Sequence, residues 1–339
     1  MTVPASLGYV MPAEWESHSR CWMAWPCREE VWGENLDAAR TAYADVARAI
    51  ADFEPVTMVC NPADVAEASL TLGNGTAIDV VSMEIDDSWL RDSGPTFLLD
   101  RNGHLAGAHW RFNAWGQKYQ PYSRDAVVAK RILKHVGARR FRAPFVLEGG
   151  AIHVDGEGTV LTTEQCLLNQ NRNPDVTKAQ VEQNLRDWLG VSTVIWLPEG
   201  LEDDETDGHI DEIACFVRPG VVLALSTDDK SDGNFDVLQT NLDILRSAKD
   251  AKGRPLQVIE VPQPARQEHK GKRLSLSYIN FYIANGGVVM PAFDVAEDER
   301  AFRIIRDAFP NRRVVQVHAR DIFLGGGGIH CITQQQPAP

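Results

Sequence analysis

The sequence predicts an α/β protein built from five similar units. The first observation is that amphipathic helices recur along the chain, at 34–53, 124–137, 177–190, 235–253 and 298–310. The second is that short apolar strands lie between these helices. The third is that glycine-rich corners interrupt several strand pairs, at 147–154, 283–291 and 323–332. Because the later helices begin at similar intervals, a repeated unit explains the pattern.

The helices are defined by apolar stripes and by capping residues. Residues spaced three and four apart form one stripe in the first helix: Leu36, Ala39, Tyr43, Val46, Ile50 and Phe53. Thr177 and Gln180 form a capping box at the start of the third helix. Gly137, Gly190 and Gly253 are natural helix stops. These signals set the predicted boundaries.

The predicted strands are short and apolar. They lie at 21–25, 56–60, 96–99, 151–154, 159–163, 213–217, 221–225, 281–284, 287–291, 314–317 and 329–333. In the last of them, Ile329 and Ile332 flank His330 and Cys331 in a strand-like alternation. No linker rich in Ser, Gly or Pro divides the chain, so we expect one catalytic domain over 1–339, with a two-domain arrangement as the alternative.

Composition limits the classes of function. The chain has 339 residues, a hydrophobic fraction of 44% and a net charge of -13, which predict a globular protein with a small cationic ligand. No long run of like charge occurs, so we expect no nucleic-acid or membrane partner. No apolar run approaches the ~18 residues of a membrane span, and no signal peptide is evident, which favours a cytoplasmic location. The six cysteines contain no C-x-x-C pair, which argues against a zinc framework.

Cys331 is the first candidate for chemistry. A thiol reacts as its thiolate, which needs a cation, a helix end or backbone amides nearby. Four glycines, from Gly325 to Gly328, come shortly before it and allow the backbone to approach closely. The alternative is a buried structural cysteine beside a structural histidine.

His209 and Asp211 are the second candidates. They are separated by one residue, so on an extended strand they face the same side. The pair fits a general base with a cation holder, two metal ligands, or the solvated end of a loop. His153 is a scattered further candidate for a metal, but no metal-binding motif is present, so we expect no metal.

Three further residues extend the candidate site. Trp89 and Asp92 precede a Ser-Gly-Pro turn, where an aromatic face and a carboxylate suit a planar cation. The alternative is a core tryptophan and a turn-capping aspartate. Glu148 precedes two glycines and is suited to orienting a histidine. A thiol, an imidazole and several carboxylates match a guanidinium ligand, which stays charged and leaves its central carbon open to the thiolate.

Longer motifs occur together along nearly the whole chain. They are "MPAEWE", "WMAWP", "WLRDSGPTF", "FNAWG", "LEGGAIHVDGEGTVLTTEQCLLNQNRNP", "ETDGHIDEIACFVRPG", "SYINFYIANGGVVMP" and "GGGGIHCITQQQP". On these motifs the chain resembles the agmatine deiminases of the guanidino-group-modifying superfamily, which also holds the bacterial peptidylarginine deiminases. The resemblance implies a five-fold pseudo-symmetric α/β propeller of ββαβ-type units around a central active site.

The resemblance also implies a role for each candidate. Cys331 is the nucleophile, His209 the general acid and base, and Glu148 the carboxylate that orients His209. Asp92 and Asp211 clamp the guanidinium. The implied reaction is hydrolysis of a C–N bond of a linear amidine: agmatine and water give N-carbamoylputrescine and ammonia through a covalent amidino-cysteine. It needs no cofactor and belongs to putrescine and polyamine biosynthesis from arginine; a homo-oligomer is allowed.

Substrate specificity is less constrained by the motifs. Agmatine ends in an ammonium, for which Glu205 is the first choice and Asp207 the alternative. Trp89 and Trp115 are expected along its alkyl chain. Arg111 departs from the family pattern and would favour a substrate with a carboxylate if it reached the pocket. The alternatives are therefore a deiminase of arginine or peptidyl arginine, a metal-dependent ureohydrolase, and a binder of polyamines without activity.

Overall fold

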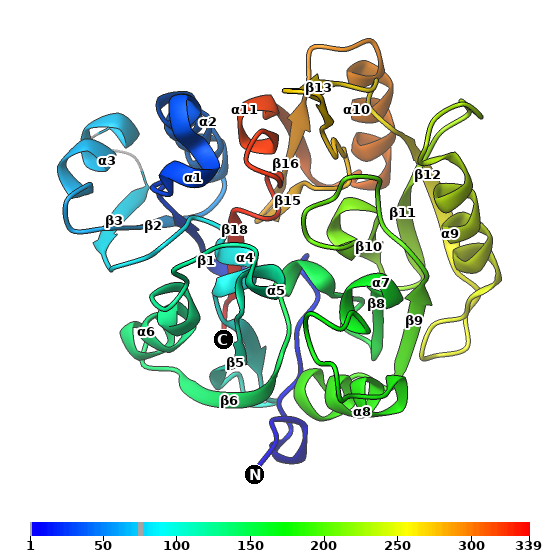
Figure 1. The fold of residues 1–339 in the computed structure, drawn as a ribbon. Helices are drawn as coiled ribbons and strands as arrows, with labels where there is room; N and C mark the ends of the chain where they lie inside the picture. The colour runs from blue at the N-terminus through cyan, green and yellow to red at the C-terminus, as the bar shows by residue number, and fades with distance from the viewer. Residues whose placement is uncertain (1, 74–76) are drawn as a thin grey trace.

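Five small sheets form a ring around the centre of the molecule (Figure 1). The computed structural model describes residues 2–73 and 77–339. In each of these five sheets, one strand pairs antiparallel with a neighbour on one side and parallel with a neighbour on the other. A helix joins the two parallel strands and lies on the outside of the ring. We call each sheet with its helix a blade; the repeating unit is ββαβ, as five similar units predict.

The blades follow the chain in order. The first blade along the chain consists of β4 (Thr96–Leu99), β5 (Leu105–Arg111), α6 (Val128–His135) and β6 (Arg139–Val146), and the second of β7 (His153–Val154), β8 (Thr159–Thr163), α8 (Lys178–Leu189) and β9 (Thr193–Leu197). The third blade consists of β10 (Ala214–Arg218), β11 (Val221–Ser226), α9 (Phe235–Ser247) and β12 (Gln257–Pro262). The fourth consists of β15 (Tyr282–Ala284), β16 (Gly287–Ala292), α10 (Glu297–Ala308) and β17 (Arg313–His318). The fifth blade joins the two ends of the chain: β18 (Thr333–Pro337), β1 (His18–Ala24), α2 (Leu36–Ala51), β2 (Val56–Cys60), α3 (Val65–Leu72) and β3 (Ile78–Ser82).

Short helices, 3₁₀ turns and a small ribbon lie within the blades and between them. The helices are α1 (Glu29–Trp32), α4 (Leu90–Ser93), α5 (Ala114–Gln117), α7 (Glu164–Leu167) and α11 (Arg320–Phe323). Five 3₁₀ turns are η1 (Ala5–Leu7), η2 (Gly33–Asn35), η3 (Asp125–Val127), η4 (Gly149–Ala151) and η5 (Ile210–Glu212). A small ribbon pairs β13 (Glu268–His269) with β14 (Lys272–Arg273). None of the helices described in 2–73 and 77–339 is long and apolar enough to cross a membrane.

The predicted helices are present, and one is shorter than expected. The capping box of Thr177 and Gln180 starts α8, and Gly190 ends it in the left-handed conformation. The helix predicted over 235–253 ends at Ser247 instead, because Ala248 is extended and Lys249 forms an isolated bridge with Pro255. Gly253 therefore lies in the turn of this bridge and is not a helix stop.

The strand predicted at 329–333 is wrong. Residues 329–332 form a turn, in which the Thr333 amide donates to the His330 carbonyl at 3.1 Å and the Thr333 hydroxyl donates to the Ile329 carbonyl at 2.9 Å. The strand follows this turn as β18, whose residues are buried although three of them are glutamines. Gln336 accepts a hydrogen bond from the indole of Trp22 at 2.9 Å, which shows how one buried amide is satisfied.

Four outer strands, β3, β6, β9 and β12, were not among the predicted strands. Each lies at the edge of its sheet and is only partly buried. In β6 the exposed positions are charged, as Arg139, Arg140 and Arg142 illustrate. Edge strands therefore lack the continuous apolar run by which the inner strands are recognised.

Candidate active site

Five segments meet at the centre of the ring, and each lies just before the first strand of one blade. They carry Asp92 before β4, Glu148 before β7, His209 before β10, Asn280 before β15 and Cys331 before β18. The ring thus brings together residues that are far apart in the sequence. All five side chains are buried.

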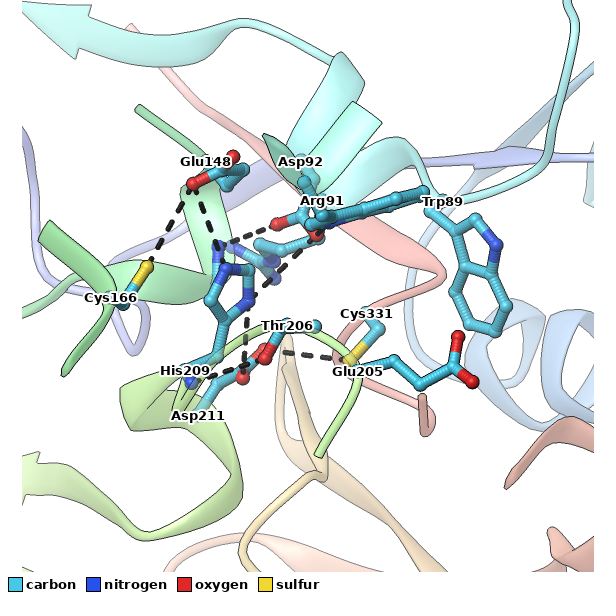
Figure 2. A network of polar contacts seen from close by, with 12 residues as sticks. Trp89, Arg91, Asp92, Glu148, Cys166, Glu205, Thr206, His209, Asp211 and Cys331 are labelled. Carbon is cyan, nitrogen blue, oxygen red and sulfur yellow. Dashed lines mark hydrogen bonds and ion pairs between the residues drawn. The ribbon is translucent and has the colours of Figure 1, made fainter. Parts of the chain in front are cut away.

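His209 lies between three carboxylates (Figure 2). Its Nδ1 is 3.8 Å from Asp92 Oδ2 and 4.0 Å from Asp211 Oδ1, and its Nε2 is 3.8 Å from Glu148 Oε2. Neither ring nitrogen has a hydrogen-bond partner among the described residues. Burial opposes the charged imidazole, but the surrounding negative charges, Asp92 first, hold the pKa of His209 well above its ordinary value. His209 is therefore a charged acid with both nitrogens free to act.

Asp92 and Asp211 face His209, and hydrogen bonds from other residues hold both carboxylates in place. Asp92 accepts hydrogen bonds from the indole of Trp115 and from the amide of Gly150, both at 2.8 Å. Burial raises the pKa of Asp92. In Asp211, burial is outweighed by His330, whose ring nitrogen lies 2.8 Å from Oδ2, so the pKa is lowered. Oδ1 of Asp211 has no hydrogen-bond partner among the described residues and is available to a ligand.

Glu148 connects His209 to a buried arginine. Its Oε1 accepts from Nε of Arg172 at 2.8 Å. Although burial opposes its ionisation, Arg172 and His209 lower the pKa of Glu148. Cys166 lies on the same side, with its sulfur 3.9 Å from Oε2 of Glu148. Glu148 therefore stays ionised beside the imidazole, which suits the orienting role predicted for it.

The Cys331 sulfur accepts a hydrogen bond from the Asn280 amide and lies beside two carboxylates. Its sulfur is 3.6 Å from Asp211 Oδ2, 3.9 Å from Glu212 Oε1 and 3.2 Å from Asn280 Nδ2. Burial, followed by the charges of Asp211, Glu212 and Asp92, raises the pKa of Cys331 well above its ordinary value. In the unliganded site the thiol is therefore neutral.

Gly150 allows the reactive groups to pack closely against its backbone. A Cβ atom at this position would lie 2.6 Å from His209 Nδ1, 2.8 Å from Asp211 Oδ2 and 3.0 Å from Asp92 Oδ1. Any side chain would therefore push the imidazole and both carboxylates away. At Gly327 a Cβ would lie 3.1 Å from the Cys331 sulfur, so a glycine allows close packing there as well.

A small cavity reaches the thiol from the surface. Its volume is about 20 Å³, little more than a water molecule needs, so it must widen to take a larger ligand. It is lined by Trp89, Asp92, Trp115, Tyr119, Glu205, Thr206, Gly325, Gly326, Gly327 and Cys331. Glu205 is partly buried and accepts from the hydroxyl of Tyr119 at 2.5 Å. It places a carboxylate in the same cavity as Cys331.

Asp207 and Arg111, which the sequence offers as further contacts of the substrate, lie away from this cavity. Asp207 is not among its lining residues, and its carboxylate is bound by Lys118, Asn171 and Arg172. Arg111 is exposed, donates to the carbonyl of Pro144 at 3.4 Å and lines a different cavity. Neither side chain is placed to contact a ligand at Cys331.

Within residues 2–73 and 77–339, two groups of side chains have atoms close enough to hold a metal. They are Glu148, Cys166 and His209, and Asp211, Glu212 and Cys331. His153, the scattered candidate, instead faces Glu14 at 3.6 Å and accepts from the amide of Phe216. Each metal-sized group contains a thiol with a raised pKa, and the imidazole of the first is held in its charged form, whereas metal ligands must be deprotonated.

Several central residues were not singled out in the sequence. Asn280 stands in the "SYIN" motif and Glu212 follows Asp211 directly. His330 precedes Cys331 and was weighed only as a structural neighbour, yet it joins Asp211 to Glu14. The signal that finds Asn280 is its place just before the first strand of a blade, which it shares with Asp92 and Cys331.

The chain matches a known family over nearly its full length. A sequence model of the Porphyromonas-type peptidyl-arginine deiminase family matches residues 10–337. Agmatine deiminases of Stutzerimonas stutzeri and Pseudomonas aeruginosa are 49% and 48% identical, over 100% of this chain and 98% of each relative. The chain therefore belongs to the Porphyromonas-type peptidyl-arginine deiminase family.

Solved structures give the same result for the fold. An agmatine deiminase of Enterococcus faecalis has a TM-score of 0.97 and 36% identity, covering 100% of this chain and 98% of the other. A substrate-bound agmatine deiminase of C. jejuni has a TM-score of 0.89 and 26% identity, covering 97% and 96%. The predicted resemblance and the predicted α/β propeller are confirmed.

Proposed function

We propose that the protein hydrolyses agmatine to N-carbamoylputrescine and ammonia through a covalent intermediate on Cys331. The observation that carries the proposal is the convergence of three groups: Asp92 and Asp211 both face the imidazole of His209, and Asp211 also lies 3.6 Å from the sulfur of Cys331. Membership of the deiminase family and full-length similarity to relatives named agmatine deiminase support it. The chain acts as one catalytic domain, because strands from both ends pair in one blade.

Asp92 and Asp211 bind the guanidinium. Both are buried, and Oδ1 of Asp211 lacks another partner among the described residues. A planar guanidinium offers paired N–H donors that match carboxylate oxygens, and it neutralises the charge that these groups carry in a desolvated site. The central carbon then faces the sulfur of Cys331.

Substrate binding activates the thiol. In the free site, burial and adjacent carboxylates raise the pKa of Cys331. A bound cation favours the thiolate, so the thiol gives up its proton to water when the guanidinium is in place. The thiolate attacks the guanidinium carbon, and a carbon–sulfur bond forms.

His209 moves the protons in both halves of the reaction. The raised pKa keeps a proton on its ring, which it gives to the departing nitrogen, so that ammonia leaves and an amidino-cysteine remains. The imidazole, now neutral, takes a proton from water as the oxygen attacks the same carbon. The carbon–sulfur bond breaks, the hydroxyl group left on the carbon passes its proton to the sulfur, and the ureido product leaves as the neutral Cys331 thiol is restored. Glu148 positions the ring throughout.

Glu205 selects the substrate. Asp92 and Glu205 are the carboxylates that line the cavity; because Asp92 binds the guanidinium, Glu205 suits the terminal ammonium of agmatine, while Trp89 and Trp115 line the alkyl chain. Asp207 is occupied by Lys118 and Arg172, which argues against it as the ammonium partner. The narrow cavity favours a small substrate over peptidyl arginine. The product enters putrescine synthesis.

The products of agmatine turnover test this proposal. Purified protein is incubated with agmatine or with arginine, with and without a chelator, and ammonia, urea and N-carbamoylputrescine are measured together. We expect equal amounts of ammonia and N-carbamoylputrescine from agmatine, no effect of the chelator, and little turnover of arginine. Formation of urea, inhibition by the chelator, or a preference for arginine would contradict the proposal.

A further inference from the structure

A second, larger cavity lies on the other side of the segment that carries Trp115. Its volume is about 750 Å³, within the range of about 300–1,000 Å³ typical of small-molecule sites. Its walls come from β5, β6, α6 and the segments 112–117 and 170–174. None of the residues that line the cavity at Cys331 lines this one.

Positive charge gathers in this cavity although the protein is acidic. Arg111, Lys130, Arg140 and Arg142 line it, and all four are exposed. Among the described residues, no carboxylate lies within 4.0 Å of their charged nitrogens, whereas an arginine such as Arg273 elsewhere in the fold is paired with acidic partners. The whole chain has a net charge of -13, yet this cavity holds these four cations and, in the described part of the chain, no carboxylate beside them. Such a cavity favours the binding of an anionic ligand.

The floor of the cavity holds an unsatisfied polar group. His109 is 8% exposed and lines the cavity, and its Nε2 donates to the carbonyl of Ala126 at 3.0 Å. Its Nδ1 is buried without a hydrogen-bond partner among the described residues. Phe112 and Tyr122 supply aromatic surface beside it. Because Nε2 carries the ring proton, Nδ1 is an acceptor, and it marks a place for a ligand hydroxyl or for an ordered water that donates to Nδ1 and to an anion.

We propose that this cavity binds a small organic anion that carries two or more carboxylate or phosphate groups. Arginine pairs with both groups through parallel hydrogen bonds, and several unpaired cations favour a multivalent ligand over a single charge. The concave shape and the aromatic wall favour a small molecule over a macromolecular surface. The proposal does not depend on the reaction at Cys331.

The cavity shares its inner wall with the active site. Asn113 donates to the carbonyl of Asn171 at 2.9 Å and accepts from the amide of Gly116, beside Trp115. Arg172, which lines the cavity, also donates to Glu148. An anion in the cavity therefore contacts the segments that hold the partners of Asp92 and His209.

Calorimetric titration with citrate and with pyrophosphate, at low ionic strength, tests the proposal. The test variant is Arg140→Gln with Arg142→Gln, both exposed on β6, so the fold is retained. The matched control is Lys134→Gln with Arg139→Gln, which removes the same charge from α6 and β6 outside the cavity. We expect saturable binding of at least one probe, weakened about tenfold or more in the test variant and less than about twofold in the control.

The two probes separate the two ligand chemistries. Tighter binding of citrate assigns the site to carboxylates, and tighter binding of pyrophosphate assigns it to phosphates. Absence of saturable binding by either probe would overturn the proposal. Equal weakening in the test and control variants would also overturn it, because it would reduce the effect to net charge.

Discussion

The sulfur of Cys331 lies 3.6 Å from Oδ2 of Asp211, a carboxylate proposed to bind the cation of the substrate. This arrangement disfavours a thiolate while the site is empty and favours it once a positive charge arrives. Through Asp211 and Cys331, substrate binding is therefore coupled to activation of the nucleophile. The thiol is protected from neutral reagents and exposed to cationic ones.

Alkylation rates test this relationship. We expect 2-chloroacetamidine, whose amidinium resembles the substrate, to modify Cys331 faster than iodoacetamide does. Peptide mass spectrometry identifies the labelled cysteine. Half-buried Cys27 is the internal control: burial and then the charge of Asp87 raise its pKa, but Asp87 is already paired with Arg28 at 3.3 Å. Asp211→Asn should remove the preference for the cationic reagent. Equal labelling of all six cysteines would contradict the account.

Gly150→Ala tests whether catalysis needs the close packing of the reactive groups around this glycine. The added methyl group would lie within 3.0 Å of His209, Asp211 and Asp92, so the groups must move apart. A displacement of this size costs catalysis about 100-fold, and we expect that loss in kcat/KM for agmatine. Ala151→Gly, the neighbouring change, is the control and should retain more activity. A Gly150→Ala variant with wild-type kcat/KM would show that the substrate binds elsewhere.

Glu205→Gln tests recognition of the terminal ammonium. Loss of the charge should raise KM for agmatine about tenfold with little change in kcat, because the interaction is made equally in the bound and transition states. Butylguanidine, which lacks the ammonium, should not distinguish the variant from the wild type. Tyr119→Phe removes the hydroxyl that donates a hydrogen bond to Glu205 but keeps the Glu205 carboxylate, so its effect on KM should be smaller. The same loss for both substrates would contradict the assignment.

Stability should fall as the pH rises above neutrality. Burial opposes the charged form of His209 and of His330, but the surrounding carboxylates raise both pKa values in the folded protein. Their stabilising contribution is complete below a pH of about 6.5, the unfolded value, and is lost as the pH rises through the folded values. Each proton held only by the folded state gives a slope of about 1.4 kcal/mol per pH unit.

Urea titrations between neutral and alkaline pH measure this dependence. Asp125, whose pKa burial raises to about 8, contributes a fall of the same sign up to that pH. The control variant is His104→Gln, which replaces an exposed histidine and keeps both buried histidines. A free energy of unfolding that is constant or rises over this range would contradict the raised pKa values.

Much of the fold was predictable because the inner parts of each blade carry strong local signals. The apolar stripe of α2 and the capping box of α8 each fix a helix. The outer strand β6 was missed because its arginines face solvent. The strand predicted around Cys331 was wrong because two isoleucines can be buried in a turn as well as in a strand. Burial alone does not distinguish the two.

The candidate site was predictable where residue type and spacing coincide with a family motif. Asp92, His209 and Cys331 come from different blades, yet Asp92 lies 3.8 Å from His209, and Asp211 lies near both His209 and the sulfur of Cys331; the roles assigned to these residues stay predictions. Asn280 and Arg172 were missed because an amide and an arginine within polar motifs have many structural roles. Their contacts with Cys331 and Glu148 arise only when the ring closes.

The most direct test of the central claim compares two buried thiols in the site, Cys331 and Cys166. Ammonia release from agmatine is measured for Cys331→Ala and Cys166→Ala, and agmatine binding to each is measured by calorimetry. We predict that Cys331→Ala binds agmatine but releases no detectable ammonia, while Cys166→Ala keeps activity within about tenfold of the wild type. Turnover by Cys331→Ala at a rate near that of the wild type would contradict the assignment of Cys331 as the nucleophile.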